Sequence, residues 1–263
     1  MNDLEYQRRV AFVLLEAIGD AGFALAGSSA IREHGLTDRP TEDVDLFTDS
    51  ATTAEQFQTA LRRGENALQT AGYRVERIRS FPLFARIRVE DTAGTSLDVD
   101  FAVNWRRDAP VRLSLGPVVS ERDAVAGKLS AVYSRAEVRD FLDLDAIRRS
   151  GRYADTDLLA MGREHDDGFD ETMFAQQLSR VANVLPSEAE EYGTTAEQLA
   201  GVQQRIMSWA IALREAHTPP APSRSTIAKR IRQQQLDARQ RALGEADPIP
   251  PERPGREPPH PSL

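Results

Sequence analysis

Two short motifs constrain the fold of this chain more than any other feature. An apolar run from Phe23 to Ala26 leads directly into Gly27-Ser28-Ser29, and a later segment reads Asp43-Val44-Asp45. Alternate side chains of a strand share one face, so the two carboxylates are expected side by side. Adjacent carboxylates repel each other unless a cation lies between them. A Gly-Ser turn at the end of a neighbouring strand offers N–H groups and a hydroxyl to phosphate oxygens. Together the motifs predict a site for a metal-bound triphosphate.

Neither motif is specific by itself. Gly and Ser are common turn residues, and Asp-x-Asp also fits a solvated edge strand. The combination is more informative, because strand, turn, short helix and second strand place both groups at the same end of adjacent strands. Mg²⁺ prefers hard oxygen ligands, so two carboxylates and substrate phosphates complete its shell. We therefore predict Asp43 and Asp45 as catalytic metal ligands, and Gly27, Ser28 and Ser29 as phosphate-binding residues.

A third acidic element, Asp98-Val99-Asp100, also alternates on a predicted strand. A third carboxylate would bind a second metal or act as general base for an attacking hydroxyl. The alternative is a polar face on an edge strand. Both residues are kept as catalytic candidates, with Asp100 as the candidate metal ligand; the pattern leaves open which of them acts.

Composition bounds the class of protein. The 263 residues are 40% hydrophobic and 28% charged, which is ordinary for a globular protein with one large or two modest domains. No apolar run approaches the roughly 20 residues of a membrane span, the N-terminus does not resemble a signal peptide, and a cytoplasmic location is expected. The chain has 0 cysteines, which excludes disulfides and thiolate metal sites. The net charge of −8 argues against a nucleic-acid coat protein but allows an enzyme with a local basic patch.

The order of predicted elements changes along the chain. Mixed helices and strands fill residues 1–110, helices are predicted for 118–217, and the Pro-rich tail 218–263 is predicted to be disordered around a helical island at 225–243. Hydrophobic periodicity predicts helices at 4–21, 29–34, 52–71, 121–150, 155–162, 170–183 and 195–216, and strands at 23–26, 43–47, 73–78, 83–90 and 96–103.

Several motifs then carry a family resemblance. Gly27-Ser28, Arg39-x-Thr41 and Asp43-Val44-Asp45 resemble the first motif of the polymerase-β-like nucleotidyltransferases, and more closely that of the AbiEii/MenT-type toxins of bacterial toxin–antitoxin systems. The match covers roughly residues 20–150. Its implied fold is α+β: the mixed sheet and helices of a polymerase-β-like nucleotidyltransferase, followed by a helical C-terminal domain. In place of Ser28-Ser29 the family often has Gly-Gly or Gly-Thr, and many members lack a third carboxylate, which leaves the metal count open.

The resemblance extends to a lysine motif and an Arg-Asp-x-x-Asp-Leu helix, which this chain matches at Lys128 and at Arg139 to Leu144. It implies an active site completed by Lys128 and Asp140 from the second domain, with Arg39 and Lys128 among the nucleotide-binding residues. Lysine would contact the triphosphate as a point charge; the alternative is a surface lysine with a buried stem. Asp140 follows Lys128 by about three turns, so a continuous helix would point both the same way. Asp143 is expected to cap the helix or to pair with an arginine, for example Arg139 or Arg135.

Other conspicuous side chains have two interpretations. Arg86 and Arg88 alternate on a predicted strand, where they would either hold an RNA backbone or pair with Glu76 and Glu90 on a solvated face. The tryptophans, Trp105 and Trp209, and His34 are interpreted as structural, the tryptophans as core or interface anchors.

The predicted function is a Mg²⁺-dependent nucleotidyltransferase that moves an NMP from an NTP to an acceptor hydroxyl and releases pyrophosphate. The resemblance suggests a toxin acting on tRNA 3′ ends, with an NTP, a tRNA and an antitoxin as partners and no membrane. Two alternatives remain: a small-molecule or protein acceptor, or a catalytically silent module that binds NTP or a partner.

Overall fold

The structure is a computed structural model that describes residues 3–217, 229 and 232–238. By its internal contacts the chain divides into two units, residues 1–217 and 218–263. In the second unit residues 232–238 are helical, and the predictions for the rest of the tail lie outside the described residues. The predicted boundary between residues 110 and 118 falls inside the first unit, which contains all elements discussed below.

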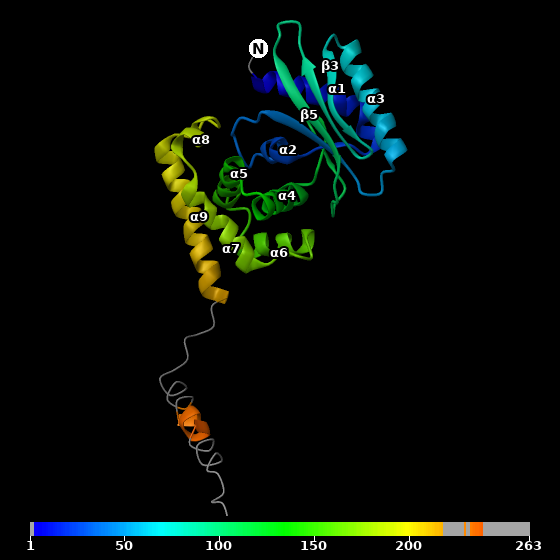
Figure 1. Ribbon diagram of the computed structural model, residues 1–263. Coiled ribbons are helices and arrows are strands. Elements are labelled where there is room, and N and C mark those ends of the chain that lie inside the picture. The colour runs from blue at the N-terminus through cyan, green and yellow to red at the C-terminus, as the bar shows by residue number, and fades with distance from the viewer. Residues whose placement is uncertain (1–2, 218–228, 230–231, 239–263) are drawn as a thin grey trace, which may run out of the picture. The chain divides into compact units, whose positions relative to one another are not determined.

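A seven-stranded mixed sheet forms the first half of this unit (Figure 1), with strand order β3-β4-β5-β2-β1-β7-β6. The five strands that the sequence predicts are all present. The short hairpin β6–β7 was not predicted, and it extends the sheet because β7 pairs in parallel with β1. The strands are β1 (Ala24–Leu25), β2 (Asp43–Thr48), β3 (Arg74–Phe81), β4 (Phe84–Glu90), β5 (Ser96–Val103), β6 (Val111–Leu113) and β7 (Gly116–Val118).

The two faces of the sheet differ in character. On β2, Val44 and Leu46 are buried, whereas Asp43 and Asp45, which alternate with them, remain partly accessible. The apolar face packs on α1 (Asp3–Ile18) and α3 (Ala54–Thr70), where the Phe23 ring lies 5.6 Å from Phe57 and 6.0 Å from Phe101. Helix α3 begins with a capping box in which Thr53 and Gln56 exchange hydrogen bonds. The alternation therefore leaves the polar face of the sheet free for a site.

Helices make up most of the remainder (Figure 1). The expected helix over 121–150 is interrupted: α4 ends at Ser134 and α5 begins at Val138. The amides of Arg135 and Ala136 both donate to the carbonyl of Ala131, and Ala136 takes a positive φ of 52°, which closes α4 as a left-handed C-cap. The other helices are α2 (Gly27–Glu33), α4 (Glu121–Ser134), α5 (Val138–Arg149), α6 (Asp155–His165), α7 (Glu171–Ser179), α8 (Pro186–Glu190) and α9 (Ala196–His217), with short 3₁₀ turns η1 (Gly19–Ala21) and η2 (Arg180–Asn183).

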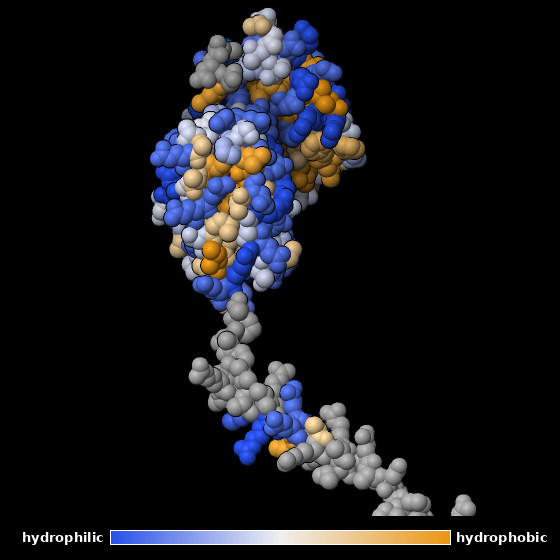
Figure 2. All heavy atoms as spheres, turned by 60° about the vertical axis from the view of Figure 1, so that its left-hand side comes forward, coloured by the Kyte–Doolittle hydropathy of each residue, from blue (hydrophilic) through white to orange (hydrophobic). Residues whose placement is uncertain are grey.

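The helical layer has its own aromatic anchor. Trp209 on α9 is 3% exposed, packs edge-to-face on Phe174 at 5.3 Å and lies under the Arg148 guanidinium. This agrees with its interpretation as a core residue. Figure 2 shows hydrophilic side chains over most of one face of the first unit, with smaller apolar groups between them. Among the described residues, no helix has both the length and the apolar character needed to cross a membrane.

Candidate active site

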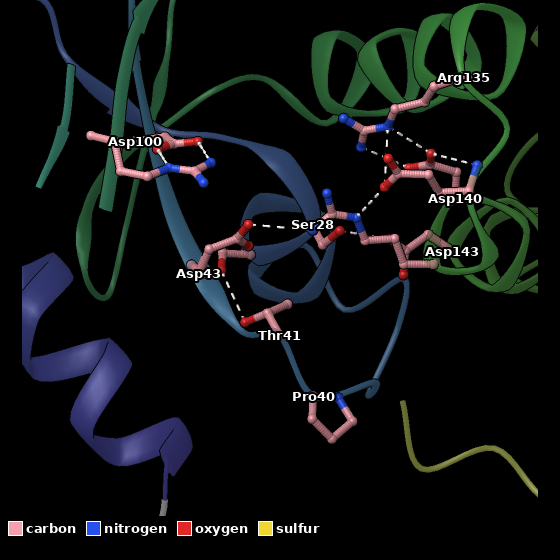
Figure 3. A network of polar contacts seen from close by, with 12 residues as sticks. Ser28, Pro40, Thr41, Asp43, Asp100, Arg135, Asp140 and Asp143 are labelled. Atoms are coloured by element: carbon pink, nitrogen blue, oxygen red, sulfur yellow. Dashed lines mark hydrogen bonds and ion pairs between the residues drawn. The ribbon is translucent and has the colours of Figure 1, made fainter. Parts of the chain in front are cut away.

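A cavity of about 340 Å³ lies between the polar face of the sheet, the start of α2 and helix α4. Its walls bring together many of the residues that the sequence singles out (Figure 3). Those lining the cavity are Gly27, Ser28, Asp43, Asp45, Asp100 and Lys128.

Parallel pairing of β2 and β5 sets the acidic wall. In the register, Asp43 lies opposite Asp98 and Asp45 lies opposite Asp100, so all four carboxylates share one face of the sheet. Three of them line the cavity, but Asp98 lies in an adjoining depression beside Arg88, which shares Asp43, Arg86 and Arg139 with the cavity. The structure therefore separates the two candidates of β5 that the sequence could not: Asp100 is on the cavity wall and Asp98 is not.

Arginines neutralise most of these carboxylates. Arg86 forms two hydrogen bonds of 2.6 Å to Asp100, and Arg88 binds Asp98 at 2.8 and 3.2 Å. The sequence suggested Glu76 and Glu90 as partners of these arginines. Asp100 and Asp98 bind them instead, because β4 and β5 pair directly and place these side chains opposite the arginines.

Asp43 and Asp45 differ in their partners. Asp43 receives a single hydrogen bond of 3.3 Å from Arg139. Within the described part of the chain, no side chain donates a hydrogen bond to the carboxylate of Asp45. Burial, reinforced by the charges of Asp43 and Asp100, raises the pKa of Asp45 to about 7. A bound cation would therefore stabilise the ionised form of Asp45, which burial and its acidic neighbours disfavour.

Glycine at position 27 makes room for that carboxylate. Gly27 opens α2 with a positive φ of 58°, and a Cβ there would lie 1.8 Å from the Oδ2 atom of Asp45. The amide of Ala26 donates to the carbonyl of Asp45 at 2.8 Å, which holds the two backbones close. No side chain fits between them without moving Asp45.

A buried lysine dominates the opposite wall. Lys128 on α4 is 5% exposed, and its Nζ atom lies 3.1 Å from Asp140 Oδ1 and 3.0 Å from Asp143 Oδ2. It also donates to Ser28 Oγ at 3.2 Å, and Ser28 Oγ donates to Asp143 Oδ2 at 2.7 Å. In Figure 3, Ser28 lies between Asp43 on one side and Asp143 on the other. The serine hydroxyl thus belongs to the lysine network and faces the acidic wall.

Two arginines complete the lysine network. Arg39 donates to both oxygens of Asp143 at 2.9 and 3.0 Å, and Arg135 donates to both oxygens of Asp140 at 2.9 and 3.1 Å. Burial opposes ionisation of Asp143, but the charges and hydrogen bonds of Lys128 and Arg39 outweigh it and hold its pKa at about 2. Asp143 pairs with an arginine as expected, but with Arg39.

Lys128 and Asp140 meet although their helix is broken. The expectation of one continuous helix was wrong; the turn after α4 folds α5 back so that Asp140 reaches the lysine from a second helix. Asp140 is fully buried and does not line the cavity.

Two predicted phosphate-binding residues are likewise outside the cavity wall. Ser29 Oγ lies 3.3 Å from Thr41 Oγ1 and donates weakly to the carbonyl of Asp43 at 3.5 Å. Arg39 is occupied by Asp143 and lies behind the lysine network. Ser29 contacts the backbone of Asp43, and Arg39 binds the carboxylate of Asp143, so both contact other residues of the site.

The carboxylates of the cavity are ligands for a divalent cation only together with other oxygen atoms. No group of three or more His, Cys, Asp or Glu side chains in the part of the chain described is arranged to hold a metal alone. Asp43 and Asp45 nevertheless fit a cation that takes its other ligands from phosphate and water, since Asp45 lacks a donor and has a raised pKa.

Comparison with known proteins decides the family. The model of the family described as "nucleotidyl transferase AbiEii toxin, type IV TA system" matches residues 12–250. The chain belongs to the AbiEii nucleotidyltransferase toxin family. Membership makes it a nucleotidyltransferase with a nucleotide substrate, a toxin role and an antitoxin partner.

Solved structures agree on the polymerase-β-like fold. JHP933 from Helicobacter pylori is 13% identical with a TM-score of 0.56, and the match covers 93% of this chain and 99% of that one. MenT4, a nucleotidyltransferase toxin from Mycobacterium tuberculosis H37Rv, is 17% identical with a TM-score of 0.50, covering 78% and 83% respectively. No curated protein sequence matches.

Sequence reasoning missed the places of Arg139 and Trp105 on the wall of this AbiEii-family cavity. Arg139, expected at most as a partner of Asp143, binds Asp43 instead. Trp105, interpreted as a core or interface anchor, is 45% exposed and lines the cavity. The available signal was its position directly after a strand, between the polar residues Asn104 and Arg106.

Gly27→Ala is expected to lower nucleotide transfer by roughly 100-fold, because its methyl group displaces the Asp45 carboxylate and small displacements of catalytic groups cost about this much. The matched control is Gly201→Ala on α9, where a Cβ meets only the flexible end of Arg205. Steady-state kinetics and thermal unfolding of both variants check this. Equal activities of the two variants would contradict the role given to Gly27.

Asp45→Asn tests the raised pKa. In metal-free protein the folded state retains a proton on Asp45 that the unfolded state releases, so the stability this group contributes is complete below its ordinary value of 3.8 and is lost as pH rises through about 7. Asparagine does not titrate. Its stability advantage over aspartate should therefore grow by about 1–3 kcal/mol between pH 5 and pH 8.

Denaturant unfolding in the presence of a chelator measures this difference. Asp38→Asn, at an exposed position outside the cavity, is the control and should show no such growth. A difference for Asp45→Asn that is the same at both pH values would show that Asp45 ionises normally.

Proposed function

We propose that this chain is a Mg²⁺-dependent nucleotidyltransferase toxin that moves an NMP from an NTP to the 3′ end of a tRNA. One observation carries the proposal: Asp43 and Asp45 line the same cavity as Ser28 and Lys128. Carboxylates suit a cation, whereas a hydroxyl and an ammonium group suit phosphate oxygens. A tRNA acceptor also implies a cytoplasmic location.

The proposed roles follow from the two walls. Asp43 and Asp45 hold the cation, which supplies charge stabilisation to the phosphate oxygens when bound. Ser28 and Lys128 bind the β- and γ-phosphates. The acceptor oxygen attacks the α-phosphorus in line, an O–P bond forms, and the bond to the leaving pyrophosphate breaks.

Asp100 is the proposed acceptor of the hydroxyl proton, since it lies on the cavity wall beside Asp45 in the register. Both of its oxygens accept from Arg86, so this role requires Arg86 to turn away. Asp98 is bound by Arg88 outside the cavity and is the weaker candidate.

Asp140, Asp143, Arg39 and Arg135 are proposed as positioning residues. A buried charge is tolerated only when hydrogen-bonding or ionic partners replace water. Asp140 and Asp143 bind the Lys128 ammonium group and so fix it at the cavity wall. Ser29 is proposed to support Asp43 through its backbone.

A row of side chains across the sheet offers a binding path for an RNA acceptor, which we call the acceptor track. In the register Arg79 pairs with Arg86, Arg86 with Asp100, and Asp100 with Asp45, so these four form a row across one face. Arg79 lies at the outer end of the row, on the edge strand, and is exposed. No carboxylate among the described residues forms an ion pair with it, which leaves its charge for a phosphate of the acceptor strand.

Incubation with each labelled NTP, Mg²⁺ and total RNA tests the reaction. We expect label in the tRNA band and a loss of at least about 1,000-fold in Asp43→Ala and Asp45→Ala, since the metal charge stabilises the transition state. Asp38→Ala, at an exposed position outside the cavity, is the control. Label in a small-molecule or protein product, with none in RNA, would overturn the tRNA acceptor and keep the transfer chemistry.

Arg79→Ala tests the acceptor track. Losing one phosphate contact should raise the KM for RNA by about 3- to 10-fold and reduce the slope of log KM against log salt by about 1, with the KM for NTP unchanged. Arg62→Ala, an exposed position on α3 across the sheet, provides the matched control. An unchanged salt slope in Arg79→Ala would exclude this path for the RNA.

A further inference from the structure

An exposed tryptophan lines the active-site cavity. Exposed large apolar side chains are scattered over the described residues, and Trp105 alone among them belongs to the cavity wall. An indole with 45% of its surface accessible leaves apolar area in water that a ligand would cover. No contact between this indole and the charged side chains of the cavity is seen among the described residues. We therefore look for a ligand contact that suits an apolar ring.

Trp105 lies beyond the Thr48 end of β2, away from Asp45. The amide of Asn104 donates to the carbonyl of Thr48, the last residue of β2, at 3.0 Å. Thr48 is three residues beyond Asp45, or about 10 Å along the strand. The cavity therefore has a charged end at Asp45 and an aromatic end at Trp105. This is the order of polar and aromatic parts in one nucleotide.

A neighbouring ring holds the indole, and the helix side of the same cavity is open. The His165 ring on α6 packs edge-to-face on Trp105 at 5.5 Å, and burial lowers the pKa of His165, which keeps this contact neutral. On α4, Gly127 lines the same cavity, and a Cβ there would meet nothing within 4 Å. Open space thus adjoins the helix wall.

We infer that Trp105 stacks on the nucleobase of the bound NTP. The inference rests on the proposed function, because it takes the triphosphate to lie on Ser28 and Lys128. Stacking uses the π-face that every base has, so Trp105 contributes affinity for all four nucleotides and does not choose among them. On the scale of base–aromatic stacking, its removal weakens NTP binding by about 5- to 100-fold.

Tryptophan fluorescence tests this without any acceptor. The chain contains 2 tryptophans, and Trp209 is buried in the helical layer. Titration of the full-length protein with Mg²⁺ and each NTP should quench the emission in wild type and in Trp209→Phe, but not in Trp105→Phe. Inorganic triphosphate, which has no base, should leave the emission unchanged.

Affinity and kinetics provide the second measurement. Trp105→Ala should raise the Kd and KM for all four NTPs by about 5- to 100-fold, with Trp105→Phe between it and wild type. Phe81→Ala removes an aromatic ring that is 60% exposed but outside the cavity, and should keep the wild-type Kd. Thermal unfolding shows whether each variant is folded.

Two results would overturn the inference. One is an unchanged Kd for NTP in a folded Trp105→Ala; the other is a raised KM for RNA alone, which would assign the indole to the acceptor. Failure of the proposed reaction looks different: nucleotide quenches Trp105, but no label reaches any product.

Discussion

The ion cluster around Lys128 is the interaction on which the rest of the site depends. Its ammonium group is nearly buried between Asp140 and Asp143, and Arg135 and Arg39 hold these two carboxylates from behind. Buried charges are tolerated only when their partners are complete, so the loss of one member leaves another uncompensated. The cluster also joins the loop before β2 to helices α4 and α5, which makes the geometry of the cavity inseparable from the packing of these helices on the sheet.

Across the cavity, the acidic wall is neutralised unevenly. Arg86 holds Asp100 with two short hydrogen bonds, whereas Arg139 holds Asp43 with one long bond, and Asp45 receives none from the side chains described. A divalent cation would therefore displace an arginine more easily from Asp43 than from Asp100. This difference favours one cation on Asp43 and Asp45 over a second cation that needs Asp100.

Features set by local periodicity could be predicted from the sequence. The five strands β1 to β5, the shared face of Asp43 and Asp45, and the glycine before the short helix follow from apolar runs, alternation and turn chemistry. The hairpin β6–β7 could not be predicted, because strands of 3 residues are stabilised by their neighbours in the sheet. The break after Ser134 has no Gly or Pro to mark it; Ala136 adopts its positive φ under tertiary constraint. The pairing of Arg39 with Asp143 joins residues that only the fold brings together.

That break has a consequence for the chemistry. Because α4 stops before α5, Arg135 in the short segment between them binds Asp140 behind the cavity, and Arg139 in the first turn of α5 binds Asp43 on the acidic wall. Glu137 contacts both arginines and so couples the two. In the proposed reaction, a cation held by Asp43 would take the place of Arg139, and the guanidinium, which lines the cavity, would be free to contact the triphosphate. On this proposal, the arginine that binds Asp43 would also bind the substrate, so cation binding and phosphate binding would reinforce each other through one side chain.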